Sequence, residues 1–390
     1  MQKKLLAAFI AFIAFNGLLI AYLNQYHSLV PFSKHNYITN AHHYLEDPRA
    51  EEKHFNLLSA IAQYDAQWYL KIANEGYTKR FMSLNTEGKT SMDRLSFAFF
   101  PLYPILLYLT NLLIHNIEFS AFLISNIFLI VNFFSLFSIV SKLYSQSIAL
   151  KTIFLLFLFP FSIFYRSYFT EGLYLFLLLW ASFFLIRKKF FWSTICFSLL
   201  NITKANGFLL NFLLLYYIYK NIREKHVSVR NAALYLAILA VPLLAWMAYC
   251  FIQTGNPLYF YSVRSAWSHV GLFAPFYNLA SILIFPVLPF HSFHLSQIEV
   301  ISVITTLFLL VVSKKLLKPQ LWWVSFLLWA SPLLVTDLMS FSRYQTVSFP
   351  LYIFLALSLK SKIYYAIVLG IFSVGLLAIS LFFINWYWIG

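Results

Sequence analysis

A carboxylate set among aromatic side chains is the feature of this sequence most suited to chemistry. Asp65 follows Tyr64 and is followed at helical spacing by Trp68 and Tyr69. Apolar rings that shelter a carboxylate from water would suit it to act as a general base toward a hydroxyl group. An ordinary alternative is equally open, because Asp is common at helix starts, where it caps the helix and stays solvated.

Further charged and polar residues stand at the ends of later apolar stretches. A guanidinium offers paired donors that match the oxygens of a phosphate. Taken singly, each such residue could be an ion-pair partner, a helix cap or a cation that extends along the interface. As a set, they would suit an anionic headgroup held in an interfacial cleft. The set comprises Arg166 and Glu171, Lys204 and Asn206, Arg264, and Arg343 with Tyr344.

The elements that must position these residues are membrane helices. The 390 residues are 61% hydrophobic and only 11% charged, with a mean hydropathy of +0.74, whereas soluble domains are roughly half apolar. Apolar runs of about 20 residues, long enough to cross a bilayer, recur along the chain. We therefore predict an all-α polytopic membrane protein that forms one integral membrane domain over residues 1–390.

About eleven transmembrane helices are expected. The first follows Lys3 and Lys4, and no small-residue cleavage pattern succeeds it, so it is interpreted as an uncleaved span. A long first loop over residues 24–97 carries the Asp65 motif and amphipathic interfacial helices. Prolines make residues 97–115 and 270–290 surface or re-entrant pieces, because they interrupt helical hydrogen bonding. The predicted spans are residues 5–23, 119–140, 148–165, 171–186, 190–202, 206–219, 231–252, 296–313, 320–337, 344–359 and 363–385.

Charge sets the orientation of these spans. With the N-terminus in the cytoplasm, the basic clusters at residues 187–189, 220–230 and 314–318 are cytoplasmic as well, as the positive-inside rule requires. Of the thirteen acidic residues, only Glu224 then lies inside, and Asp65, Glu171 and Asp337 share the outer face. The candidate chemistry is thus predicted on the extracytoplasmic side of a plasma membrane.

Composition and spacing also exclude several classes of function. The net charge of +15 comes from short basic clusters between apolar runs, which argues against a nucleic-acid partner. Cys196 and Cys250 fall inside apolar segments and are expected to be core thiols. His42, His43 and His54 lack the spacing of metal ligands, so we expect no metal site and no cofactor.

Several short motifs, in the same order along residues 60–350, resemble those of the PIG-V family, which comprises the second mannosyltransferase of GPI-anchor synthesis and its prokaryotic relatives. The family usually has Trp where this chain has Tyr64, and often Arg where it has Lys204. The matching segments are residues 64–77, 99–104, 164–171 with its Thr-Glu pair, 204–207, and Arg343-Tyr344 before Phe349-Pro350.

The resemblance implies a C-type glycosyltransferase fold, a polyprenyl-phosphate mannose type of donor, and a catalytic Asp in the outer loop, which by position is Asp65. A prokaryotic relative, which the Phe, Ile and Lys richness favours, need not make GPI anchors, so the expected acceptor is lipid-linked or glycan-linked. Tyr64, Trp68, Tyr69, Asn206 and Tyr344 join the charged residues as expected substrate contacts.

The expected reaction is a direct displacement at the anomeric carbon. Asp65 is expected to take the proton of the acceptor hydroxyl. Arg343 or Lys204 stabilises the negative charge of the leaving phosphate, and Arg166 is a further candidate for that role. Glu171 orients hydroxyl groups of the acceptor or the sugar. A lipid-linked sugar flippase or another transporter is the alternative, and a non-catalytic lipid-binding subunit is a third. Transporters place charges near the midplane, often in inverted repeats, but here polar residues gather at one face and no repeat is visible.

Overall fold

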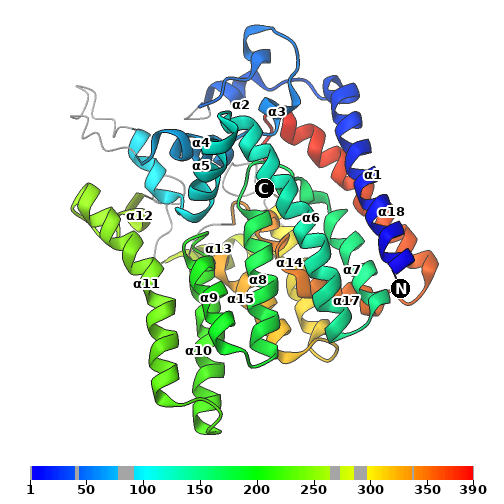
Figure 1. Cartoon of the computed structure of the whole chain (residues 1–390). Helices are drawn as coiled ribbons and strands as arrows, with labels where there is room; N and C mark the ends of the chain where they lie inside the picture. The colour runs from blue at the N-terminus through cyan, green and yellow to red at the C-terminus, as the bar shows by residue number, and fades with distance from the viewer. Residues whose placement is uncertain are drawn as a thin grey trace.

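The computed structural model describes residues 2–39, 44–77, 92–263, 273–284, 297–335 and 338–389. In these ranges the chain forms helices and no strand (Figure 1). Arg264, Asp337, His42 and His43 lie outside the described residues. The helices are α1 Gln2–Tyr26, α2 Lys34–Thr39, α3 Leu57–Ala60, α4 Asp65–Glu75, α5 Leu102–Ile114, α6 Ile117–Leu143, α7 Gln146–Phe157, α8 Glu171–Ile186, α9 Phe190–Asn201, α10 Gly207–Arg223, α11 Val229–Thr254, α12 Tyr259–Ser262, α13 Ala274–Ile284, α14 Gln297–Ser313, α15 Pro319–Val335, α16 Phe341–Gln345, α17 Phe349–Ser358 and α18 Lys362–Ile384, with short 3-10 turns between some of them.

Among the described residues, four helices, α1, α6, α11 and α18, are long and apolar enough to cross a membrane. A helix rises 1.5 Å per residue, so helices of this length exceed the hydrocarbon thickness of about 30 Å. Large apolar side chains on α11 point away from the protein, among them Val241, Leu244 and Ile252, which are more than half exposed. Such surfaces are stable against lipid rather than water. The all-helical fold and the presence of membrane-length helices agree with the prediction.

Two of the predicted spans are broken in the structure. Residues 148–165 form the 12-residue helix α7 and then a 3-10 turn, Pro160–Tyr165, that begins at a proline. Residues 344–359 contribute the end of α16 and the separate 10-residue helix α17. At 1.5 Å per residue, α7 and α17 are about 18 and 15 Å long, too short to cross a bilayer alone. The two short helices pack against each other.

The segment 97–115 also differs from its prediction. Its two prolines do not interrupt a helix, because Pro101 precedes α5 and Pro104 lies in the first turn, where no backbone N–H is needed for helical bonding. The helix that follows runs unbroken for 13 residues. It packs against α4 and α6.

Helix α4, which carries Asp65, is buried within the protein rather than spread along an interface. We expected the rings of Trp68 and Tyr69 at headgroup level, but each is only 5% exposed. Trp68 stacks on Phe99 with ring centroids 5.5 Å apart, and Tyr69 meets Phe99 and Tyr103 edge to face. These aromatic contacts fix the position of α4 against α5.

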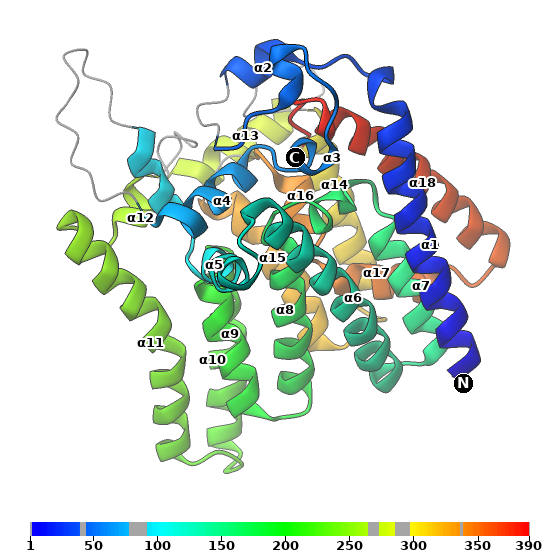
Figure 2. The same ribbon diagram turned by 45° about the horizontal axis from the view of Figure 1, so that its top comes forward.

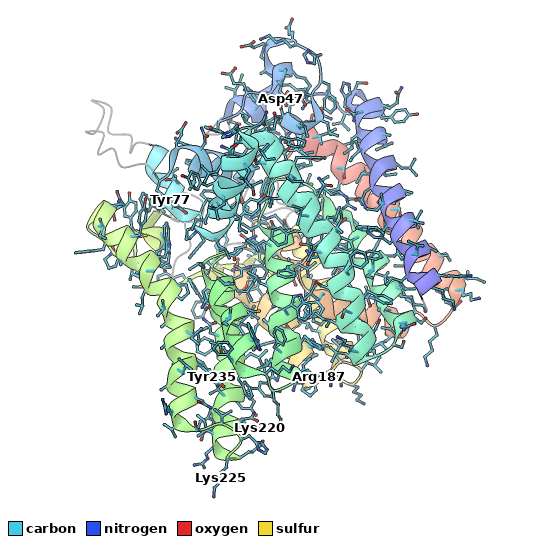
Figure 3. All side chains as sticks on the ribbon, in the orientation of Figure 1. Asp47, Tyr77, Arg187, Lys220, Lys225 and Tyr235 are labelled. Carbon is cyan, nitrogen blue, oxygen red and sulfur yellow. The ribbon has the colours of Figure 1, made fainter. Side chains whose placement is uncertain are left out.

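Basic side chains gather at one end of the molecule. Figure 3 shows Arg187, Lys220 and Lys225 at this end, far from Asp47. The carboxylate of Glu224 lies at the basic end, 3.8 Å from Lys220 and 3.9 Å from Lys188. Figure 2 shows α4 and α16 toward the end of the molecule that carries α2 and α3, away from the basic loop between α10 and α11.

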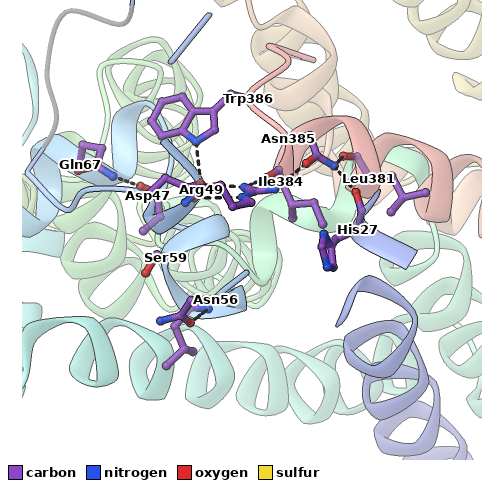
Figure 4. Close-up of polar contacts among 12 residues, drawn as sticks. His27, Asp47, Arg49, Asn56, Ser59, Gln67, Leu381, Ile384, Asn385 and Trp386 are labelled. Atoms are coloured by element: carbon purple, nitrogen blue, oxygen red, sulfur yellow. Dashed lines mark hydrogen bonds and ion pairs between the residues drawn. The ribbon is translucent and has the colours of Figure 1, made fainter. Parts of the chain in front are cut away.

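The end of the chain fastens the first loop to the helical body. Buried Arg49 bonds both oxygens of Asp47, the Asn385 side chain at 2.6 Å and the Ile384 carbonyl at 2.5 Å. The Trp386 indole N–H donates to Asp47 at 3.0 Å (Figure 4). We call Asp47, Arg49, Asn385 and Trp386 the terminal latch. It joins residues more than 330 positions apart in the sequence.

Replacing Arg49 by Ala is expected to lower the thermal stability of the detergent-solubilised protein by several degrees. The change leaves the Asp47 carboxylate, 2% exposed, without its cation, and breaking a buried pair costs about 3–5 kcal/mol. Lys53→Ala is the matched control, because its ion pair with Glu51 is more than half exposed. Equal melting temperatures for both variants would contradict the structural role of the latch.

Candidate functional site

Asp65 is the first residue of α4 and its carboxylate binds Arg343. The Arg343 Nη1 donates to Asp65 Oδ2 at 2.7 Å. Tyr64, not Asp65, occupies the N-cap position, and no side chain caps this helix. The capping alternative therefore does not describe Asp65. Its side chain is 25% exposed whereas that of Arg343 is 4% exposed, so the carboxylate is the accessible partner of the pair.

The pair continues into a row of alternating charges. The Nε of Arg343 lies 3.3 Å from Glu171 Oε1, and the same oxygen accepts a hydrogen bond from Lys204 Nζ at 2.6 Å. We call Asp65, Arg343, Glu171 and Lys204 the ionic cluster. Its members come from α4, α16, α8 and the turn between α9 and α10. Two cations balance two carboxylates, which is what permits charges to be buried at this depth.

Aromatic rings surround the guanidinium of Arg343. The rings of Phe164, Phe169, Tyr344 and Trp388 have centroids 5.3 to 5.5 Å from its central carbon. The Tyr344 ring also lies 4.3 Å from Lys204 Nζ. Ring faces attract cations most strongly where water is excluded. The rings therefore hold the two cations against the carboxylates of Asp65 and Glu171.

Packing against α6 places Glu171 at the start of α8. Ser125 donates to the Ser167 carbonyl at 3.0 Å and Asn132 donates to the Gly172 carbonyl at 2.8 Å. A Cβ on Gly172 would lie 3.1 Å from the Cβ of Phe128, so a larger residue would push α8 away from α6. The Thr-Glu-Gly sequence thus brings the start of α8 close to α6 and fixes the position of Glu171 relative to α6.

A close turn places Lys204. A Cβ on Gly207 would lie 2.8 Å from the backbone of Leu200, which a real side chain could not do without a shift. Leu102 N–H donates to the Ile202 carbonyl at 3.0 Å and so ties this turn to the start of α5. The small residue at the end of the Lys-Ala-Asn-Gly motif therefore lets the turn fold back and direct Lys204 toward Glu171.

Arg343 is positioned by a residue that the sequence reasoning did not single out. Glu299, in the first turn of α14, accepts from the backbone N–H and the hydroxyl of Ser342, each at 2.6 Å. The Tyr165 hydroxyl donates to the Thr346 carbonyl at 2.8 Å from the other side. The sequence did offer one indication of Glu299. It is an acidic residue at the start of a strongly apolar helix, on the side of the membrane predicted to be outside.

The two cations differ in how firmly they hold their protons. Burial lowers the pKa of Lys204 to about 8, although the neighbouring Glu171 opposes this shift. Burial would also lower the pKa of Arg343, but Asp65 and Glu171 beside it raise that pKa above its ordinary value. Arg343 is therefore a permanent cation, and Lys204 can lose its charge within an accessible pH range.

A small cavity borders the ionic cluster, lined by Glu171, Tyr174, Lys204, Asn206 and Arg343 among others. Its volume is about 10 Å³, close to the room that one water needs. Within the described residues, Glu171 Oε2 and the Tyr174 hydroxyl are buried without a hydrogen-bond partner. A single water suits this cavity and a substrate does not, whereas Asp65 is accessible from outside the cluster.

A larger apolar groove lies at the C-terminal end of α4, the end opposite Asp65. It has a volume of about 630 Å³ and is walled by α4, α5 and α11, with Ile72, Tyr77, Ile105 and Trp246 among its lining residues. Ile202 also lines it and stands two residues before Lys204. The size is typical of sites that bind small molecules, and the apolar lining suits a hydrocarbon chain.

Other predicted site residues lie apart from the ionic cluster. The guanidinium of Arg166 is bound to Asn16 Oδ1 at 2.7 Å and to the Ser162 carbonyl at 2.9 Å, which is a structural role between α1 and the Pro160–Tyr165 turn. Tyr64 is buried and donates to the Trp386 carbonyl. Trp68 is packed on Phe99. Tyr69, also buried, lies beside Thr170 and within electrostatic reach of Asp65.

No metal site is evident in the part of the chain that the structure describes, where no three His, Cys, Asp or Glu side chains gather as ligands. The donor set of the ionic cluster is itself unsuited to a cation, because both carboxylates are already bound to Arg343 or Lys204.

Comparisons with known proteins give no further guide to the class of this chain. No protein-family model matches it. No curated protein matches it either.

The dependence of the buried charges on each other can be measured with paired substitutions. Glu171→Leu is expected to destabilise the protein by about 3–5 kcal/mol, because Lys204 is left without its partner. Adding Lys204→Met should restore a large part of that loss, since the apolar pair needs no compensation. Thermal unfolding of both variants in detergent tests this. A double variant less stable than Glu171→Leu alone would contradict the pairing.

Proposed function

We propose that this protein is a membrane-embedded glycosyltransferase. It moves a hexose, mannose by resemblance to the PIG-V family, from a polyprenyl-phosphate-sugar donor to a lipid-linked or glycan-linked acceptor, with inversion at the anomeric carbon. The observation that carries the proposal is the ionic cluster itself. Asp65, Glu171, Lys204 and Arg343 come from four separate motifs of that resemblance and meet side chain to side chain.

The cluster fits a reaction in which a phosphate leaves. Arg343 offers N–H donors in a planar fork that matches phosphate oxygens, and Lys204 adds a second cation on the far side of Glu171. Both cations are held in place before any substrate arrives. Charge stabilisation of this kind is effective because the donors need no reorganisation when negative charge develops.

Asp65 is proposed as the general base. Its carboxylate takes the proton of an acceptor hydroxyl while the acceptor oxygen forms a bond to the anomeric carbon. The bond from that carbon to the phosphate oxygen breaks, and the polyprenyl phosphate departs with the electron pair. Arg343 binds Asp65 Oδ2 and so aims the carboxylate, whose exposed part faces the approaching acceptor.

The apolar groove at the C-terminal end of α4 is the proposed seat of the polyprenyl chain. Its lining includes Ile202, close in sequence to Lys204, so a chain in the groove would bring its phosphate toward the cationic side of the cluster. A polyprenyl chain comes to the groove from lipid that is equally apolar, so the groove would select and orient the chain by packing rather than by the hydrophobic effect.

The membrane arrangement that goes with this function has a cytoplasmic N-terminus and the ionic cluster on the extracytoplasmic side of a plasma membrane. The basic end, with Arg187, Lys220 and Lys225, would face the cytoplasm. Lipid-linked donors of this type could then be used where soluble nucleotide sugars are absent.

Replacing Asp65 by Asn is expected to reduce sugar transfer by a factor of about 10²–10⁴, the usual contribution of a positioned general base. The amide keeps the size of the side chain but cannot take the proton. The assay follows radiolabelled mannose from polyprenyl-phosphate mannose to lipid extracts, with purified protein in liposomes and EDTA present. Glu51→Gln, in the exposed part of the same loop, is the control. Full activity in Asp65→Asn would remove Asp65 from the role of base.

Transfer is expected to fall as the pH rises through about 8. Below that value Lys204 is protonated and can stabilise the leaving phosphate, whereas above it the side chain becomes neutral. In Lys204→Arg the guanidinium stays charged, so the decline should move to higher pH. The rate of mannose transfer by the two proteins, measured between pH 6 and 10 at about one-unit steps, tests this expected shift. Superimposable profiles would show that Lys204 does not carry the titration.

A further inference from the structure

Trp388 lies beside Arg343, the cation that binds Asp65. Its ring centroid is 5.5 Å from the guanidinium carbon of Arg343. It also meets the Tyr64 ring edge to face, with centroids 4.7 Å apart, and Tyr64 directly precedes Asp65. A residue near the end of the chain is thus brought to the entrance of a site formed by the first loop and α16.

The terminal latch fixes the place of this ring. Trp386 is fully buried, its carbonyl accepts from the Tyr64 hydroxyl at 2.7 Å and from Asn36 at 2.8 Å, and its indole N–H binds Asp47 (Figure 4). Trp386 also adopts a left-handed backbone conformation, φ 65°, which a non-glycine residue holds only where its surroundings require it. Trp388 follows two residues later and has little freedom to move away.

The rings around Arg343 divide into buried and accessible ones. Phe164 and Phe169 are almost fully buried, but Tyr344 and Trp388 are partly exposed. Tyr344 lies on the side of the cluster where Lys204 stands. Trp388 contacts the ring of Tyr64, the residue that precedes Asp65. The partly exposed indole therefore lies against Arg343, the cation that binds the proposed base.

We propose that Trp388 is the stacking surface for the acceptor, and that the acceptor presents a hexose or similar polyhydroxylated ring at this point. The C–H face of such a ring is apolar and slightly positive, and so complements the negative face of an indole. A ring stacked there directs its hydroxyl groups sideways, toward Asp65. The inference rests on the proposed function, because it assigns the side from which that site receives its acceptor.

The test uses octyl mannoside as the acceptor probe and polyprenyl-phosphate mannose as the donor, with the full chain in liposomes. Trp388→Ala is expected to raise the KM for octyl mannoside about tenfold, equivalent to about 1.4 kcal/mol, and to leave the donor KM within about twofold. Trp388→Phe should recover most of the loss. Trp192→Ala, at an indole that is 54% exposed elsewhere, is the matched control.

A purely structural ring would give a different result. If Trp388 only held Arg343, its loss would lower kcat or raise the donor KM and would leave the acceptor KM unchanged, which would overturn the proposal.

If wild-type protein transfers no sugar, a binding measurement still tests the stacking role of Trp388 separately from the proposed function. Octyl mannoside with a photoreactive diazirine on its ring is expected to label wild-type protein, with excess octyl mannoside as competitor, and to label Trp388→Ala about tenfold less under conditions of low occupancy. Equal competed labelling of the two proteins would overturn the stacking role.

Discussion

One buried guanidinium joins the parts of this structure that the proposed chemistry requires. Arg343 binds Asp65 at 2.7 Å and lies 3.3 Å from Glu171, which in turn binds Lys204. Because a charge taken out of water is costly unless it is paired, these four residues hold one another at their positions. Much of the surrounding structure holds these four residues in place. Glu299 binds Ser342 next to Arg343, and hydrogen bonds from α6 fix the position of Glu171. Aromatic rings enclose the guanidinium of Arg343.

The same constraint explains why the two ends of the chain meet. The base candidate Asp65 begins α4, a helix within the long first loop. The terminal latch fastens that loop to the helical body, because Arg49 and Asp47 are bound to Asn385 and Trp386 just after α18. The latch also carries Trp388 to the accessible side of the ion pair. The same contacts thus hold the first loop in place and bring Trp388 beside Arg343, which suits a reaction that depends on the orientation of a carboxylate.

Much of the fold could be predicted from the sequence, because apolar runs of membrane length and charged turns are local signals. The predicted spans 119–140, 171–186, 231–252 and 363–385 correspond to α6, α8, α11 and α18. The predictions were wrong where tertiary packing determines the burial or the length of a helix. Helix α4 is buried by Phe99 and Tyr103 rather than lying at an interface, and α7 and α17 are shorter than the spans predicted there.

At the site, the motifs pointed to Asp65, Glu171, Lys204 and Arg343, but Arg166 binds Asn16 instead. Glu299 and Trp388 were missed, because their contacts with α16 join residues far apart in the chain and leave no local pattern.

The central claim is that this site breaks the bond between a sugar and a lipid phosphate. The most direct measurement is the yield of free polyprenyl phosphate when purified protein in liposomes is given polyprenyl-phosphate mannose and an acceptor lipid extract. We expect one polyprenyl phosphate to be released for each mannose transferred, and about 10²–10⁴-fold less release by Asp65→Asn. Movement of intact donor across the bilayer, with no polyprenyl phosphate released, would contradict the account and identify a transporter.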